Sequence, residues 1–80
     1  MQLGTRWSVG TPPPSTLPDA VLTAVRGVEE ELRAENVDAT AWRWTLTYLE
    51  RSPVVELDDG TVIRYSPGED RASVIPPDSA

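Results

Sequence analysis

The side chains that most often perform catalysis are missing from this chain. It contains no histidine, cysteine or lysine, so only carboxylates, hydroxyls, tyrosines and arginines could act on a substrate. A pair of carboxylates can hydrolyse a glycoside, but that reaction needs a cleft that holds the sugar. A chain of 80 residues with one small core has little room for such a cleft. We therefore expect no enzyme, no catalytic residue and no cofactor.

Asp58, Asp59 and Gly60 form the segment that most resembles a metal-binding loop. A calcium loop of the EF-hand kind spreads its ligands over about 12 positions and closes on a glutamate. Here Thr61 and Ile63 follow instead. Asp-Asp-Gly is also typical of a tight turn between two strands. We predict a turn at this place and no metal site.

The first element that could position a site is a helix, which the sequence predicts over residues 17–35. Thr16 is the expected N-cap, and Asn36 followed by Val37 predicts a left-handed Schellman ending. Opposite charges four residues apart predict the ion pairs Arg26–Glu30 and Glu29–Arg33. The apolar stripe of this helix consists of five aliphatic residues at helical spacing: Leu17, Val21, Val25, Val28 and Leu32.

Three later segments, 41–48, 54–57 and 61–65, alternate between apolar and polar residues and predict strands. A two-residue turn at Arg51-Ser52 would place Leu49 opposite Val54. A three-residue loop ending at a left-handed Gly60 would place Val55 opposite Ile63 and keep the apolar residues on one face. That face consists of Trp42, Trp44, Leu46, Tyr48, Val55, Leu57, Ile63 and Tyr65.

The predicted fold class is α+β with two layers. One helix packs on a three- to four-stranded antiparallel sheet in the order strand-helix-strand-strand-strand, with residues 3–9 as the strand at an edge. Residues 1–66 form one domain. Residues 67–80 are rich in proline and glycine and are expected to form a flexible C-terminal tail, in which Val74-Ile75 could add a short pairing.

The two tryptophans of the predicted sheet admit two interpretations. Trp42 and Trp44 could stand exposed and stack on the bases of a single-stranded nucleic acid. Such a site also needs a basic groove, and only Arg43 and Arg64 are near. We expect both tryptophans to belong to the core instead.

The net charge of −6 excludes some partners. It argues against direct nucleic-acid binding and against anionic membrane surfaces, because both depend on clustered basic residues. No apolar run approaches the roughly 20 residues of a membrane span, and no secretory signal is visible, so we expect a cytoplasmic protein. The use of arginine for all seven basic residues is typical of a high-G+C bacterium or its phage.

Small residues line one flank of the predicted helix, namely Ala20, Ala24, Gly27 and Ala34. A glycine inside a helix costs about 0.5–1 kcal/mol relative to alanine, so something could approach closely there. The occupant could be the chain's own proline segment or tail, a partner helix, or a second copy in a homodimer. The first hypothesis is thus a non-catalytic protein-interaction or self-association module, which contacts its partner through this flank or through a free sheet edge.

The alternative hypothesis is an acidic mimic of nucleic acid that occupies a nucleic-acid-binding protein. Its complex would weaken steeply with salt, whereas an apolar contact would not. A small-ligand binder is the second alternative, and it requires a pocket. The acidic surface of the mimic would consist of Glu29, Glu30, Glu31, Glu35, Asp38, Asp58 and Asp59.

Overall fold

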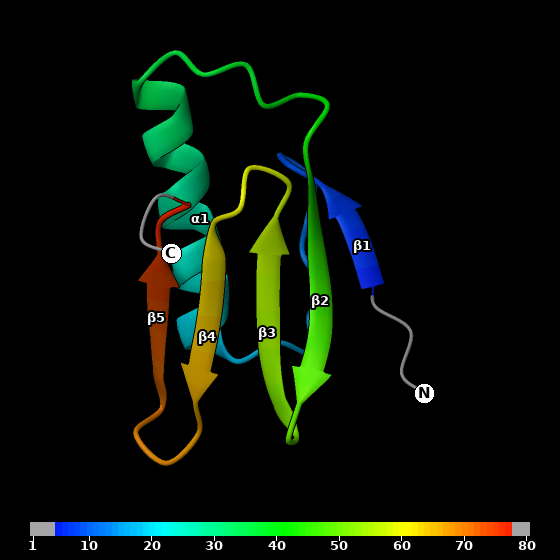
Figure 1. Ribbon diagram of the computed structural model, residues 1–80, viewed down its shortest axis with the longest axis vertical. Coiled ribbons are helices and arrows are strands. Elements are labelled where there is room, and N and C mark those ends of the chain that lie inside the picture. Colours follow the sequence, from blue (N-terminus) through cyan, green and yellow to red (C-terminus); the bar gives the residue numbers. More distant parts are fainter. Residues whose placement is uncertain (1–4, 78–80) are drawn as a thin grey trace.

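The computed structural model describes residues 5–77, and it confirms the α+β class. Five strands form one antiparallel sheet in which every strand lies beside its neighbour in the chain (Figure 1). Residues 3 and 4 of the predicted first strand, together with residues 78–80, lie outside the described part. The elements are β1 (Thr5–Ser8), α1 (Asp19–Ala34), β2 (Arg43–Leu49), β3 (Ser52–Leu57), β4 (Val62–Ser66) and β5 (Arg71–Ile75).

The fifth strand is the main departure from the predicted three to four strands. β5 lies within the segment 67–80 and pairs along the whole of β4, from Ser66 opposite Arg71 to Val62 opposite Ile75. Its sequence, Arg-Ala-Ser-Val-Ile, shows little of the alternation that marks the other strands, because the inward residue Ala72 is small. The pairing with β4, rather than a strong local pattern, makes this segment a strand.

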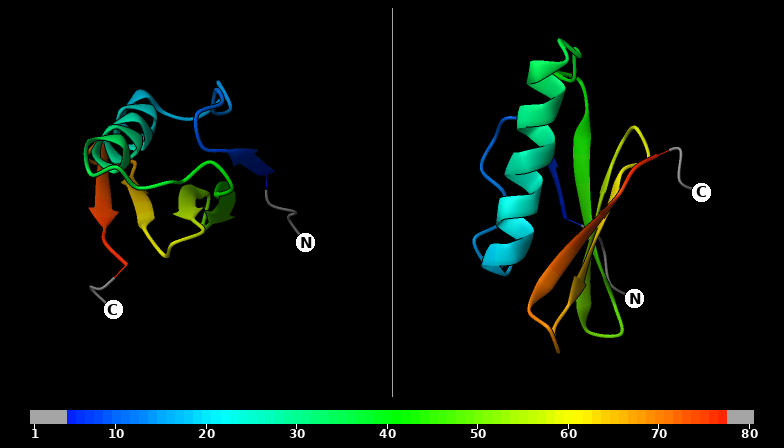
Figure 2. Two further views of the ribbon diagram at one scale, coloured as in Figure 1. Left: turned by 90° about the horizontal axis from the view of Figure 1, so that it is seen from above. Right: turned by 90° about the vertical axis from the view of Figure 1, so that its left-hand side faces the viewer.

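The helix covers one face of the sheet and lies toward one side of it. α1 contacts β4 and β5. Residues 9–18 lead from β1 to the helix and lie over the β1 side of the same sheet face (Figure 2). The opposite face of the sheet has no covering element in the described chain. The molecule is therefore a two-layer structure with one covered and one uncovered sheet face.

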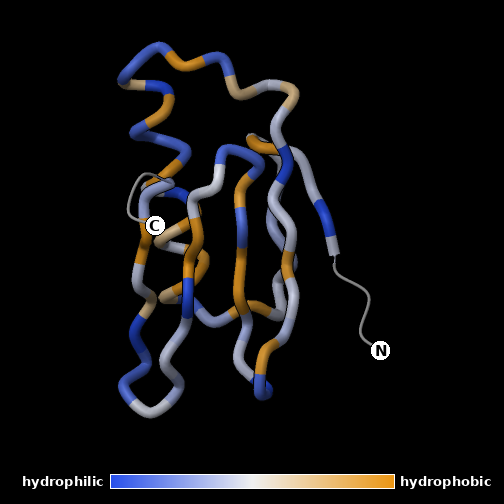
Figure 3. The backbone as a smooth tube through the Cα atoms, in the orientation of Figure 1, coloured by the Kyte–Doolittle hydropathy of each residue, from blue (hydrophilic) through white to orange (hydrophobic). Residues whose placement is uncertain are grey.

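The core forms where the helix stripe meets the covered face of the sheet. Trp44, Val55 and Ile63 are completely buried, as predicted. Hydrophobic residues recur along the strands and hydrophilic residues mark the hairpin ends (Figure 3). Tyr48 was expected in this core, but it is 45% exposed, because the β2–β3 hairpin extends beyond the start of the helix (Figure 1). The core cluster consists of Leu17, Val21, Val25, Trp44, Leu46, Val55, Leu57 and Ile63.

The predicted start of the helix is wrong by two residues. Pro18, not Thr16, is the N-cap, and its carbonyl accepts hydrogen bonds from the Val21 and Leu22 N–H groups at 3.0 and 3.1 Å. Leu17 cannot easily take a helical conformation because it precedes a proline. Its side chain nevertheless enters the core.

The predicted Schellman ending is confirmed. Asn36 has a φ of 59°, and its N–H donates to the Arg33 carbonyl at 3.0 Å. The Val37 N–H donates to the Leu32 carbonyl at 2.9 Å, which completes the motif. The helix therefore ends where the sequence indicates.

One of the two predicted turns is confirmed and the other is wrong. Gly60 has a φ of 101°, its N–H donates to the Leu57 carbonyl, and Val55 lies opposite Ile63, as expected for the three-residue loop. The first turn falls on Glu50-Arg51, with φ values of 52° and 69°, so that Leu49 pairs with Ser52 instead of Val54. A slip of two residues keeps every side chain on its face, so the apolar pattern could not distinguish these registers.

No helix among residues 5–77 has both the length and the apolar character needed to cross a bilayer.

Candidate protein-binding site

The predicted acidic surface does not act as one patch, because four of its seven carboxylates support the fold. Glu29 is half-buried and accepts a hydrogen bond from the Trp44 indole N–H at 2.8 Å and a longer one from the Gly10 N–H at 3.4 Å. The predicted Glu29–Arg33 ion pair is therefore wrong, because the carboxylate turns toward the sheet. The predicted Arg26–Glu30 pair does not form either, as is common for exposed pairs of small net energy.

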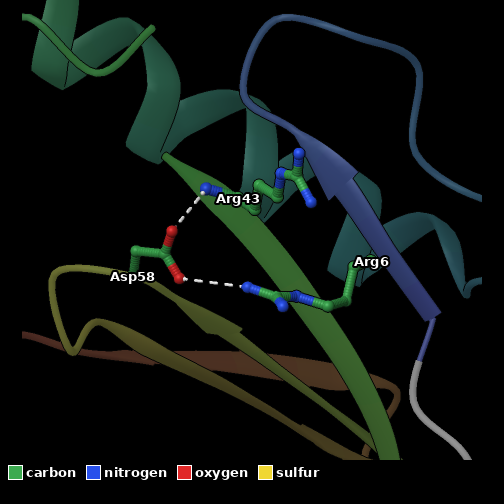
Figure 4. A network of polar contacts seen from close by, with 3 residues as sticks. All are labelled: Arg6, Arg43 and Asp58. Carbon is green, nitrogen blue, oxygen red and sulfur yellow. Dashed lines mark hydrogen bonds and ion pairs between the residues drawn. The ribbon is translucent and has the colours of Figure 1, made fainter. Parts of the chain in front are cut away.

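Asp58, which follows β3, contacts both β1 and β2 (Figure 4). Its carboxylate accepts a hydrogen bond from the Arg43 backbone N–H at 3.0 Å and lies 3.7 Å from the Arg6 guanidinium. Asp38 accepts hydrogen bonds from the hydroxyl and the N–H of Thr40, and these bonds lower the pKa of Asp38 below its ordinary value. Both carboxylates are thus committed to contacts within the chain.

The small-residue flank of the helix is open at Gly27 in the part of the chain that the structure describes. A Cβ built at Gly27 would meet no atom within 4 Å among the described residues. Ala34 is exposed as well, whereas Ala24 packs against the core and Ala20 is half-buried. Within the described chain, neither the proline segment nor β5 covers Gly27, so these segments do not explain the glycine at that position. A partner helix or a second copy at this flank stays a prediction.

The uncovered face of the sheet carries four of the seven arginines. Arg6, Arg43, Arg64 and Arg71 share this face by strand register, with Glu56 as an acidic neighbour. The sequence alone suggested only two basic residues near the sheet. Two grooves lie on the other side of the molecule, beside the helix.

The two edges of the sheet differ in how their backbone groups are paired. At the β1 edge, the Ser8 carbonyl accepts hydrogen bonds from the N–H of Thr11 at 3.1 Å and from its hydroxyl at 2.6 Å. The loop that follows β1 thus folds back and closes the end of this short strand.

The β5 edge has no comparable closure. The Leu57 N–H points toward β4, where it donates to the Thr61 carbonyl, and successive residues of a strand direct these groups to alternate sides. The backbone groups of Val55 therefore also face β4, and those of its partner Ile63 face β3. Val74 lies opposite Ile63, so its N–H and C=O groups, like those of Ala72, point away from β4 and lie on the outer edge of β5. No described residue supplies a hydrogen-bond partner for them.

A groove of about 230 Å³ lies between α1 and β5, close to this open edge. Val28 and Leu32 from the helix and Val74, Pro76 and Pro77 from the end of the chain give it an apolar floor. Val74 is 46% exposed although it is a large aliphatic residue on the helix side of the sheet. The groove therefore leaves apolar surface uncovered directly beside unpaired backbone groups.

Acidic side chains form the rim of this groove. Glu31 and Glu35 come from the last turns of α1, and Asp59 comes from the loop between β3 and β4. Asp59 accepts a hydrogen bond from the Thr61 N–H at 2.8 Å. The Thr61 side chain also lines the groove, on a residue that is only 5% exposed.

A second groove, of about 200 Å³, lies on the opposite flank of the helix end. Val9, Leu32, Val37 and Ala39 contribute its apolar surface. Glu29, its half-buried carboxylate, is already bound to Trp44. At the end of β1 next to this groove, the Ser8 carbonyl is already paired with Thr11. It therefore offers fewer unused groups than the groove beside β5.

The described residues hold no group of three acidic, histidine or cysteine side chains close enough to coordinate a metal ion. The rim carboxylates beside β5 therefore do not converge on one point.

No protein-family model, characterised protein or solved structure matches this chain. The β5 edge and its groove, which come from three separate segments, are the surface on which the structure concentrates unused binding groups.

Proposed function

We propose that this protein is a non-catalytic interaction module that accepts an extended segment of another protein at the β5 edge. The observation that carries the proposal is the open edge at Ala72 and Val74 beside an apolar groove. In strand addition, main-chain hydrogen bonds supply affinity, and a neighbouring groove selects alternate side chains of the added strand. The β5 edge and the groove offer both.

The length of the open edge suits a short partner segment. Arg71 begins β5, and Pro76-Pro77 follow it, so only a few backbone groups between them can pair. Charged residues and prolines at such positions also limit unwanted sheet extension between copies of a chain. These features favour a peptide of another protein over indefinite self-association.

The acidic-mimic alternative has less support. Glu29, Asp38, Asp58 and Asp59 hold contacts within the chain, which leaves Glu30, Glu31 and Glu35 as unpaired carboxylates of the seven proposed. A cytoplasmic location without a membrane or direct nucleic-acid partner stays part of the proposal, supported by the net charge of −6.

A displayed library of random short peptides, selected on the immobilised protein, tests the proposal. Selected peptides should lose binding to the variant Ala72→Pro, because proline removes the outward N–H while the ladder between β4 and β5 stays intact. The matched control is Ser8→Pro, which removes an outward N–H from the opposite edge strand and should bind as well as the unmodified protein. Circular dichroism and thermal melting must show that both variants fold.

Two results would overturn the proposal. One is a selection in which every peptide binds Ala72→Pro and the unmodified protein equally. The other is light scattering that shows a stable dimer through β5 itself, broken by Ala72→Pro, because the edge would then be occupied by a second copy.

A further inference from the structure

We infer that the partner segment carries an arginine two positions from an apolar residue, so that both side chains point to the same face, and that the guanidinium enters the groove between α1 and β5. This inference rests on the proposed function and adds the chemistry of the partner. It depends on two features of the groove: an unfavourable arrangement of carboxylates at its rim, and an apolar floor.

The two glutamates of the rim lie at positions where their charges do not stabilise the free protein. Glu31 and Glu35 lie one helical turn apart, and like charges at this spacing repel. They also occupy the C-terminal end of α1, where the helix dipole disfavours negative charge. No arginine among the described residues forms an ion pair with either of them. A cation from a partner would relieve both unfavourable interactions.

The far side of the groove offers hydrogen-bond acceptors. Asp59 uses its Oδ1 atom for the Thr61 N–H, and no described residue donates to its Oδ2 atom. The Thr61 side chain, which also lines the groove, adds a hydroxyl oxygen as a further acceptor.

The spacing of these acceptors favours arginine over a compact cation. The carboxylates are too far apart to share a metal ion, whereas a guanidinium carries five N–H donors in a planar fork. Its aliphatic stem can lie along Val28, Leu32 and Val74 on the floor. A lysine ammonium is a smaller, more strongly hydrated charge and would reach fewer of the acceptors.

The experiment uses the peptides that require the β5 edge, identified by their loss of binding to Ala72→Pro. Their sequences should be enriched in arginine two positions from an aliphatic residue. Fluorescence anisotropy then measures one such peptide and its arginine-to-glutamine version. The protein with Glu31→Gln and Glu35→Gln together should bind the arginine peptide about tenfold more weakly, since two exposed ion pairs are lost.

Glu30→Gln is the matched control, because Glu30 is exposed on the same helix and does not line the groove. It should change the affinity less than about twofold. The glutamine peptide should bind the double variant and the unmodified protein equally.

The outcomes separate this inference from the proposed function. Edge-dependent peptides without any enrichment in arginine, or a double variant that binds like the Glu30→Gln control, would overturn the arginine site and leave the strand-accepting edge in place. A selection that yields no edge-dependent peptide would overturn both.

Discussion

The β1 side and the β5 side of this sheet treat their polar groups in opposite ways. On the β1 side, Thr11 closes the Ser8 carbonyl, Asp58 joins Arg6 to the Arg43 N–H, and Glu29 accepts the Trp44 indole. On the β5 side, two backbone positions and two glutamates have no partners among the described residues. A fold this small satisfies its polar groups where they maintain the structure, so the unsatisfied side is where binding is expected.

Several groups on the β1 side depart from this comparison. By strand alternation, the outward backbone groups of Arg6 and the Ser8 N–H have no partner among the described residues either. Trp7 stacks on Trp44 with ring centroids 6.3 Å apart, yet its indole N–H is buried without a partner. The stacked indoles bury a large apolar area, which offsets the cost of one unpaired donor.

The largest effect is expected on the β1 side. Glu29→Ala would leave the buried Trp44 indole N–H without an acceptor and remove the contact to the Gly10 loop, at a cost of about 1–3 kcal/mol in the free energy of unfolding. Glu30→Ala, one residue along the helix and exposed, should change it by less than about 0.5 kcal/mol. Urea denaturation followed by tryptophan fluorescence measures both, and equal effects would contradict a structural role for Glu29.

Two glycines provide the next test, because the same substitution should act in opposite directions. Gly60 has a φ of 101°, and a Cβ there would lie 3.2 Å from the Pro77 Cβ, so Gly60→Ala should destabilise by about 1–2 kcal/mol. Gly27 lies in a helix with open space around it, so Gly27→Ala should stabilise by about 0.5–1 kcal/mol. Chemical denaturation that gave both changes the same sign would contradict this account of the two positions.

A smaller effect should appear at the rim of the groove. Glu35→Lys replaces a carboxylate that opposes both Glu31 and the helix dipole, and should stabilise the protein by about 0.3–1 kcal/mol. The same variant should bind the arginine peptide more weakly. A thermal melt that showed destabilisation would mean that Glu35 has a structural role like that of Glu29, and the contrast between the two sides would fail.

The smallest effect concerns the hairpin that leads into β5. The Tyr65 hydroxyl donates a hydrogen bond to Asp70, and this bond raises the pKa of Tyr65 above its ordinary value of 10.0. Because the folded pKa is the higher one, the stabilisation is complete below about pH 10 and is lost as the pH rises through the folded pKa. Asp70→Asn should lower the Tyr65 pKa, measured by absorbance titration in a Tyr48→Phe background. An unchanged titration would show that this bond is absent in solution.

Local patterns predicted much of the fold and little of the site. The Schellman ending at Asn36 and the loop at Gly60 depend on residues adjacent in sequence, so the sequence could indicate them. The turn at Glu50-Arg51 was missed because neither residue is typical of a positive φ. Of β5, the sequence indicated only a short pairing at Val74-Ile75, because the strand character of the rest comes from pairing with β4.

The sequence could not predict the candidate site, and the reason is different. Glu31, Asp59 and Val74 come from a helix, a loop and a strand, and only the fold brings them to one groove. The sequence showed the carboxylates as one acidic set. It could not separate Glu29, which turns inward, from Glu31, which does not.

Amide hydrogen exchange at β5 tests the central claim most directly. In the free protein, the Ala72 and Val74 amides should exchange fast while Ser73 and Ile75, which face β4, stay protected; a selected peptide should slow Ala72 and Val74. Exchange at Ala72 and Val74 that is already slow without peptide, or that does not change when the peptide is bound, would contradict an open edge that accepts a strand.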